Sequence, residues 1–225
     1  CHRKGWYAFV AELKVKEAAH FRIGKGVHAV NEHLLTTGEW PDDPSTWPVP
    51  AELSPAPNEE IAFWRDIAAP GRETLTPLVQ HPGLHIESHL SAELLKEPNK
   101  VMDFKGFIDA GIADPAVAGS VHPLSYVAPW VQDHKSRGTL NPRYLPTPAE
   151  LASNRQMLGY VPPFLFVACG MDPDNPPEQV AVTHWNYQTR DGFAFKAVHG
   201  IAPWENVERN WLEIRGVASL MHDLA

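Results

Sequence analysis

The sequence predicts an α+β fold with a mainly antiparallel sheet, a C-terminal hairpin, a packed C-terminal helix and a Pro-rich helical middle section. The hairpin is indicated by two apolar and β-branched runs, residues 179–188 and 193–201, joined around the turn-forming dipeptide Asp191-Gly192. A helix after Pro203 is indicated by apolar side chains at spacings of three and four, namely Trp204, Val207, Trp211, Ile214, Ala218 and Met221. We expect this stripe to pack on the sheet.

Two further strands and a helix are expected to complete this core. Residues 6–15 alternate apolar and polar side chains, and residues 164–168 are wholly apolar, so both segments are predicted strands. Residues 17–36 are predicted to be helical. Their apolar stripe consists of Val27, Val30, Leu34 and Leu35.

The middle of the chain, residues 38–163, is rich in proline. Residues 38–57 hold six prolines and two tryptophans, which favours an arm that wraps the domain over a flexible linker. Residues 111–148 read as irregular. Helices are predicted from an Asn58 cap, at 73–80, 91–96 and 100–110, and from a Thr147 capping box to Leu158. We treat residues 1–225 as a single domain, with 38–163 as an elaboration of it.

Composition narrows the class of protein. With 44% apolar and 20% charged residues, the chain has the composition of a globular domain. A formal net charge of -8 weighs against binding nucleic acid or an anionic membrane, and no apolar run approaches the roughly 20 residues of a membrane helix. Two cysteines, Cys1 and Cys169, are too few for a disulfide scaffold. We therefore expect a cytoplasmic protein.

Three histidines and a glutamate cluster within residues 81–89. In a strand, alternation would send His85, Glu87 and His89 to one face. In a helix, His85 and His89 would be neighbours one turn apart. Either conformation would bring two imidazoles to one metal ion or one substrate.

The hairpin carries two more histidines, and their relation depends on the loop. A two-residue loop at Asp191-Gly192 would place His184 directly opposite His199, with Cβ atoms about 5 Å apart. A three-residue loop with a bulge at Gly192 would instead pair Thr183 with His199. We expect His184 and His199 to line a pocket together with His85 or His89, covered by the arm of residues 38–57.

These residues predict a metal-dependent or histidine-based enzyme that acts on a small molecule, of hydrolase or oxygenase type. Glu87 is the expected carboxylate ligand or base, and His184 and His199 double as acid–base groups. Imidazole and carboxylate ligands suit zinc or iron, although the spacing fits no zinc signature. The expected metal ligands are His85, His89, His184 and His199.

Two other classes of function stay open on the sequence. Cys1 is a candidate N-terminal nucleophile of an amidohydrolase, with its own α-amino group as base and with Arg3 and Lys4 lowering the thiol pKa. The Pro- and Trp-rich arm also suits a structural subunit, either in a homo-oligomer or in a larger assembly. The expected partner of the enzyme is a small-molecule substrate, with neither nucleic acid nor membrane.

Overall fold

The computed structural model describes residues 19–97, 100–114 and 129–223, so the predicted strand at 6–15 and Cys1 lie outside the described residues. Five strands form one sheet in the order β1-β2-β3-β4-β5. Every neighbouring pair is antiparallel except β3 and β4, which are parallel. The predicted α+β fold with a mainly antiparallel sheet is confirmed. The strands are β1 (His85–Glu97), β2 (Lys100–Ile112), β3 (Trp130–Arg137), β4 (Gln179–Gln188) and β5 (Phe195–Pro203).

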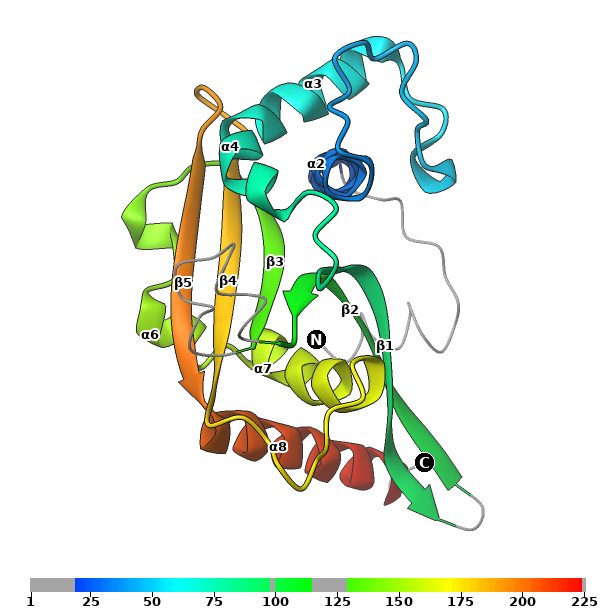
Figure 1. The fold of residues 1–225 in the computed structure, drawn as a ribbon, viewed down its shortest axis with the longest axis vertical. Coiled ribbons are helices and arrows are strands. Elements are labelled where there is room, and N and C mark those ends of the chain that lie inside the picture. The colour runs from blue at the N-terminus through cyan, green and yellow to red at the C-terminus, as the bar shows by residue number, and fades with distance from the viewer. Residues whose placement is uncertain (1–18, 98–99, 115–128, 224–225) are drawn as a thin grey trace.

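Helices cover the sheet in two groups, and each group encloses its own apolar core (Figure 1). Alternate residues of β4 enter the two cores: Trp185 packs with the first group, and Val182 packs with the second. The first group is α2 (Ala19–Thr37), α3 (Asn58–Ala68) and α4 (Arg72–Leu75), and the second is α6 (Pro148–Leu151), α7 (Arg155–Pro162) and α8 (Trp204–Asp223). The short turns are η2 (Ala51–Leu53), η3 (Ala69–Gly71), η4 (Thr76–Leu78), η5 (Pro142–Tyr144) and the π-helix η6 (Pro163–Ala168).

Helix α2 follows the prediction closely. All four side chains of its predicted stripe are buried: Val27, Val30, Leu34 and Leu35. Gly26 allows α2 to lie close to α3, because a Cβ at that position would stand 2.1 Å from Cδ2 of Trp64.

The proline-rich connector is ordered against α2 and α3. Its Trp47 and Leu53 are buried in the first core, and the guanidinium of Arg22 donates to the carbonyl of Leu53 at 2.8 Å. The Asn58 cap was wrong, since Asn58 is already helical and Pro57 occupies the N-cap position. Proline fixes φ near the value that this entry into the helix needs.

Four assignments of secondary structure between residues 91 and 168 were wrong. Residues 91–96 and 100–110 form the long β1–β2 hairpin rather than helices, and residues 130–137 form strand β3 rather than an irregular stretch. Residues 164–168 are helical rather than a strand. Cross-strand pairing overrides the local helix propensity of a segment, and a short apolar run has no period that separates helix from strand.

The capping box at Thr147 and Glu150 is present as predicted, but the helix that follows is shorter. Helix α6 ends at Leu151, and Asn154 then caps α7 through a bond from the Met157 N–H to Oδ1 at 3.1 Å. Asparagine competes with the helical hydrogen bonds and starts a second helix in a new direction.

The C-terminal elements are largely as predicted. In the β4–β5 hairpin Thr183 pairs with His199, so placing His184 opposite His199 was wrong. The pairing of Tyr187 with Phe195 leaves an odd number of residues in the loop, which excludes the two-residue turn.

Along α8 the predicted stripe is only partly buried. Val207 and Ala218 are buried, while Trp211 is half-buried against the ring of Phe104, with centroids 5.4 Å apart. Glu205, Glu208 and Arg209 face solvent as expected. The side chain of Met221 lies outside the description. Within the described ranges, no helix combines the length and apolarity that a membrane crossing requires.

Candidate functional site

The predicted cluster on β1 does not converge. His85 lies against Phe164 and 3.6 Å from the Cys169 sulfur, whereas the ring of His89 contacts the ring of Phe107. Glu87 forms an ion pair elsewhere, since its Oε1 lies 3.2 Å from Nδ1 of a histidine on α2. Glu87 has a φ of 44°, and a residue in this left-handed region interrupts the alternation on which the prediction depended.

The two hairpin histidines also occupy separate places. His184 is 3% exposed, and its Nε2 lies 3.9 Å from Oδ2 of Asp133, beyond hydrogen-bond distance. His199 instead hydrogen-bonds the hydroxyl of Thr183 at 3.0 Å and lines a groove beside residues 142–148. The expected pocket shared by His184, His199 and a β1 histidine is therefore not formed, because the register offsets the two side chains.

The structure assembles a different site, at a fork between β2 and β3. The two strands pair only over three positions, from Ala110 with Gln132 to Ile112 with Trp130, and they separate beyond these. The next residue of each strand into the fork is an aspartate, Asp109 on β2 and Asp133 on β3. Both are nearly buried. The fork therefore brings two carboxylates from separate strands into one region.

Asp109 is held inside the fork from two sides. Its Oδ2 accepts a hydrogen bond of 2.5 Å from the backbone N–H of His134 on β3. The same oxygen lies 2.7 Å from Nε2 of His28, which extends from α2. The adjacent His28 cation and these hydrogen bonds keep the pKa of Asp109 below its usual range although burial opposes this. Asp109 is therefore a fixed anion.

His28 bridges two carboxylates. Its Nε2 contacts Asp109 and its Nδ1 contacts Glu87, so both ring nitrogens face acceptors. Burial alone would lower the pKa of His28, but the two carboxylates together raise it to about 10. The ring is thus an imidazolium at neutral pH.

Asp133 forms the second acidic position, next to a lysine. Burial, followed by repulsion from Asp109, raises the pKa of Asp133 to about 6. The ammonium of Lys135, two residues further along β3, opposes this shift through a contact of 2.5 Å with Oδ2. The carboxylate is therefore poised between its charged and neutral forms, and an added cation would favour the charged form.

His134, between these two residues, points towards α2. Its Nδ1 lies 3.3 Å from the amide nitrogen of Asn31, which can only donate, so Nδ1 accepts and the ring proton lies on Nε2. Burial, together with the nearby His28 cation, lowers the pKa of His134 to about 3. The two rings pack edge to face with centroids 4.8 Å apart. The site thus pairs a charged imidazole with a neutral one.

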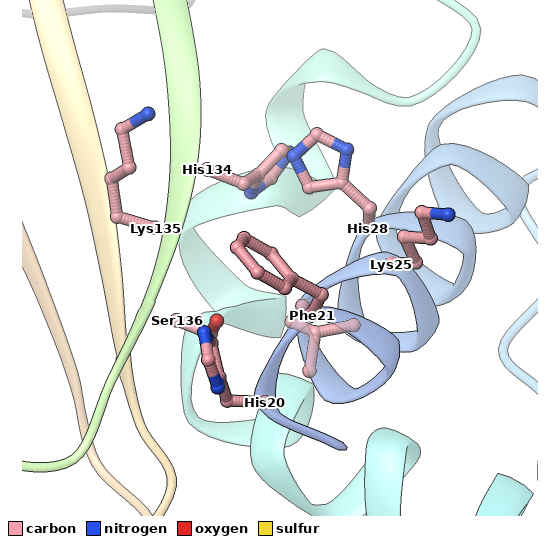
Figure 2. Close-up of a pocket in the computed structure, with 9 residues that line it drawn as sticks. His20, Phe21, Lys25, His28, His134, Lys135 and Ser136 are labelled. Carbon is pink, nitrogen blue, oxygen red and sulfur yellow. The ribbon is translucent and has the colours of Figure 1, made fainter. Parts of the chain in front are cut away.

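A pocket of about 360 Å³ opens beside this cluster, between the start of α2 and strand β3. Figure 2 shows His28 and Lys25 extending from α2, and Lys135 and Ser136 extending from β3. Phe21 projects between the two elements and is 59% exposed. The pocket is lined by His20, Phe21, Gly24, Lys25, Val27, His28, His134, Lys135 and Ser136.

Helix α7 adds two polar side chains on the other side of Lys135. The Lys135 ammonium donates to Oε1 of Gln156 at 3.4 Å, and Nε2 of Gln156 donates to the hydroxyl of Tyr160 at 3.0 Å. These contacts orient the lysine from outside the fork. The row of polar groups therefore runs from α2, across the fork, to α7.

The fork contains a donor set suited to a divalent cation. One ligand atom from each of His28, Glu87 and Asp109 lies within 4.8 Å of the others. Asp133 supplies a further carboxylate close enough to Asp109 for the two charges to repel. A set dominated by carboxylate oxygens suits Mg²⁺ or Mn²⁺ better than the predicted zinc or iron, which prefer more nitrogen and sulfur ligands.

Comparison with known proteins identifies no relative of this chain. No protein-family model, no curated protein and no solved structure matches it significantly. The geometry of the fork is therefore the basis for any statement about function.

Sequence reasoning missed Asp109, Asp133, Lys135 and His28. A signal was present, since Asp133 follows the apolar pair Trp130-Val131 closely, and Asp109 stands inside the apolar run from Phe107 to Ile112. A charge inside an apolar run is expensive to bury and so indicates a site. The signal was lost because residues 111–148 were read as irregular and 100–110 as helical.

Proposed function

We propose that this protein is a divalent-metal-dependent phosphodiesterase whose substrate is a nucleic-acid strand. The observation that carries the proposal is the group of His28, Glu87 and Asp109 at the β2–β3 fork, whose ligand atoms lie within 4.8 Å of one another, with Asp133 near enough for Asp109 to raise its pKa. Mg²⁺ is commonly held by one or two carboxylates together with oxygens of a substrate phosphate. The proposal keeps the predicted hydrolase class and changes the residues, the metal and the substrate.

The electrostatics of the fork favour a cation. Two buried carboxylates repel each other, and the raised pKa of Asp133 reflects that repulsion together with burial. A divalent ion held by Glu87 and Asp109 would offset the negative charge that Asp109 exerts on Asp133. His28 would then continue to hold Asp109 from the α2 side, or would give one nitrogen to the ion in exchange for its proton.

The chemistry that follows is hydrolysis of a phosphodiester. A bound metal ion polarises a phosphoryl oxygen and lowers the pKa of a coordinated water. The water oxygen forms a bond to phosphorus, and the bond from phosphorus to the leaving oxygen breaks, which yields a phosphomonoester and an alcohol. Lys135 is placed to orient the attacking water and to offset negative charge that develops on the phosphate.

The surroundings of the pocket support a nucleic-acid strand as the substrate. Lys25, His20 and Ser136 offer cationic or hydroxyl groups to phosphate oxygens, and exposed Phe21 offers an aromatic face to a base. The net charge of -8 disfavours non-specific binding elsewhere on the surface, so binding would depend on the metal and on this local rim. A small phosphodiester is the alternative, in keeping with the small-molecule substrate expected from the sequence.

The test is cleavage of defined substrates by the purified protein. Single-stranded DNA, duplex DNA, single-stranded RNA and a cyclic dinucleotide would each be incubated with Mg²⁺, Mn²⁺, Zn²⁺ or EDTA. We expect Mg²⁺- or Mn²⁺-dependent cleavage that Asp133→Asn and Lys135→Ala each reduce by about 10²-fold or more, as for loss of one group that stabilises a transition state.

Two matched variants control for general effects. Asp174→Asn alters an exposed aspartate in the loop before β4, and Lys196→Ala alters an exposed lysine on β5, so both should cleave like the wild type. Equal activity of Asp133→Asn and the wild type, or no cleavage with any substrate and metal, would refute the proposal.

A second candidate is the structural-subunit function, and the outer face of α8 favours it. Leu212, Val217 and Leu220 are each more than half exposed, which is a costly arrangement for an isolated chain. Light scattering during gel filtration would test it. A self-associating protein whose mass falls to the monomer in Leu212→Lys would support this function, and a monomeric wild type would contradict self-association through this face.

A further inference from the structure

We propose that the ring pair His89 and Phe107 is a nucleobase-binding subsite beside the metal site. This inference rests on the proposed phosphodiesterase function and adds the place where the base of the nucleotide next to the cleaved phosphate is held. The occupant is an unpaired base of the substrate strand.

The pair lies on the β1–β2 hairpin. His89 and Phe107 are cross-strand partners in the register, and their ring centroids are 4.0 Å apart with an interplanar angle of 53°. Phe107 is 49% exposed, and His89 is exposed as well. Two rings in contact at a solvent-facing position form an aromatic surface that the described residues leave open, and stacking a flat base on it would bury apolar area.

The surface is continuous with the fork. Phe107 and Asp109 lie two residues apart on β2, and the side chain of Ile108 between them is buried in the second core on the opposite face. Phe107 therefore points away from the second core, and Asp109, two residues further along β2, contacts His28 of α2. Two strand residues span roughly 6.6 Å, a distance that one nucleotide can bridge. A phosphate held near Asp109 would bring an adjacent base to Phe107.

The neighbouring residues limit the surface to one or two bases. The next cross-strand pair on this face is Ser91 with Lys105, which offers an exposed ammonium to a following phosphate. The pair after that is Glu93 with Asp103, two acidic residues that would repel a polyanion. An aromatic surface bounded in this way is too small for a protein partner and suits a short stretch of single-stranded nucleic acid.

The experiment compares binding of two strands by the full chain in its slow Lys135→Ala form, which keeps the carboxylates, with Mn²⁺. One is a short fluorescein-labelled single-stranded DNA, and the other is a strand of the same length made of abasic residues, which keeps the phosphates and lacks the bases. We expect Phe107→Ala to weaken binding of the normal strand by roughly 10- to 100-fold, as stacking energies per base imply. Binding of the abasic strand should not change, and Phe107→Trp should restore binding of the normal strand.

Phe193→Ala is the matched control, because Phe193 is 41% exposed and pairs with the ring of Phe63 on a different part of the molecule. It should bind both strands like the parent protein. If Phe107→Ala weakens binding of both strands equally, or of neither, the subsite is overturned. The phosphodiesterase proposal would still stand in that case, provided that the wild type cleaves DNA. A wild type that cleaves no nucleic acid overturns both.

Discussion

His28 is the residue on which the charge balance of the fork depends. It alone places a positive charge between Asp109 and Glu87, through contacts of 2.7 and 3.2 Å. The positive φ of Glu87 is strain that the fold accepts to turn this carboxylate towards His28. Strain and a strongly shifted pKa at one place are typical of functional sites.

The pH dependence of stability should report on His28. Its pKa is raised from 6.5 to about 10 in the folded protein, so its charged form stabilises the fold fully below pH 6.5. That contribution is lost as the pH rises from 6.5 through about 10. Urea unfolding across this range should show the free energy of unfolding falling more steeply in the wild type than in His28→Gln. Parallel curves would contradict the bridging role.

At the scale of elements, close approaches between helices and strands position the site. Gly26 permits the contact of α2 with α3, and Gly24 lies where a Cβ would be 3.1 Å from Oγ of Ser136 on β3. These contacts set the distance between α2 and the sheet, and this distance determines where the His28 ring lies in the fork. Helix α7 acts from the other side through Gln156 and Lys135.

Gly26→Ala should destabilise the protein by about 1–3 kcal/mol or more, because the new Cβ would overlap the Trp64 ring in a packed core. Gly216→Ala on α8 is the control. Nothing lies within 4 Å of that Cβ, so alanine should gain about 0.5–1 kcal/mol of helix propensity. Thermal or denaturant unfolding of both variants measures the difference. A neutral Gly26→Ala would show that the α2–α3 spacing is not fixed there.

Thr147→Ala should cost about 1 kcal/mol, because it removes the hydroxyl that accepts from the Glu150 N–H in the capping box of α6. Denaturant unfolding is the measurement. The loss should be independent of added metal, since α6 packs on β5 and not on the fork. A change below experimental error would mean that the tight contact of Gly200 with Pro148, and not the cap, holds this helix.

At the scale of the whole molecule, the sheet separates two cores and places the fork where two of its strands diverge. Residues from α2, β1, β2 and β3 meet there, although Glu87 and Lys135 are far apart in sequence. A ligand at the fork would therefore link both halves of the molecule and should stabilise the fold as a unit.

Mn²⁺ should raise the unfolding temperature of the wild type, with a gain of about 2.7 kcal/mol when its concentration is 100 times the dissociation constant. Asp133→Asn should lose most of this gain, because it removes one of the two carboxylates. Differential scanning calorimetry with and without the ion measures the effect, and EDTA should reverse it. An identical gain in both proteins would place the ion elsewhere.

The sequence by itself determined the elements whose pattern is local. The stripe of α2, the β4–β5 hairpin and the onset of α8 each follow from a period or a turn signal that a short window contains. It could not determine the β1–β2 hairpin, which depends on pairing between segments such as His89 and Phe107, nor the register that separates His184 from His199.

The site was decided by tertiary structure alone. His28 becomes an imidazolium only because folding brings Asp109 and Glu87 to its two nitrogens, and the pKa of Asp133 is raised because folding buries it and brings Asp109 near it. The sequence contains a local concentration of histidines, and their spacing along the chain predicted a site there. Burial, charge and the divergence of two strands act through space, and they kept Glu87 but combined it with residues that the spacing did not indicate.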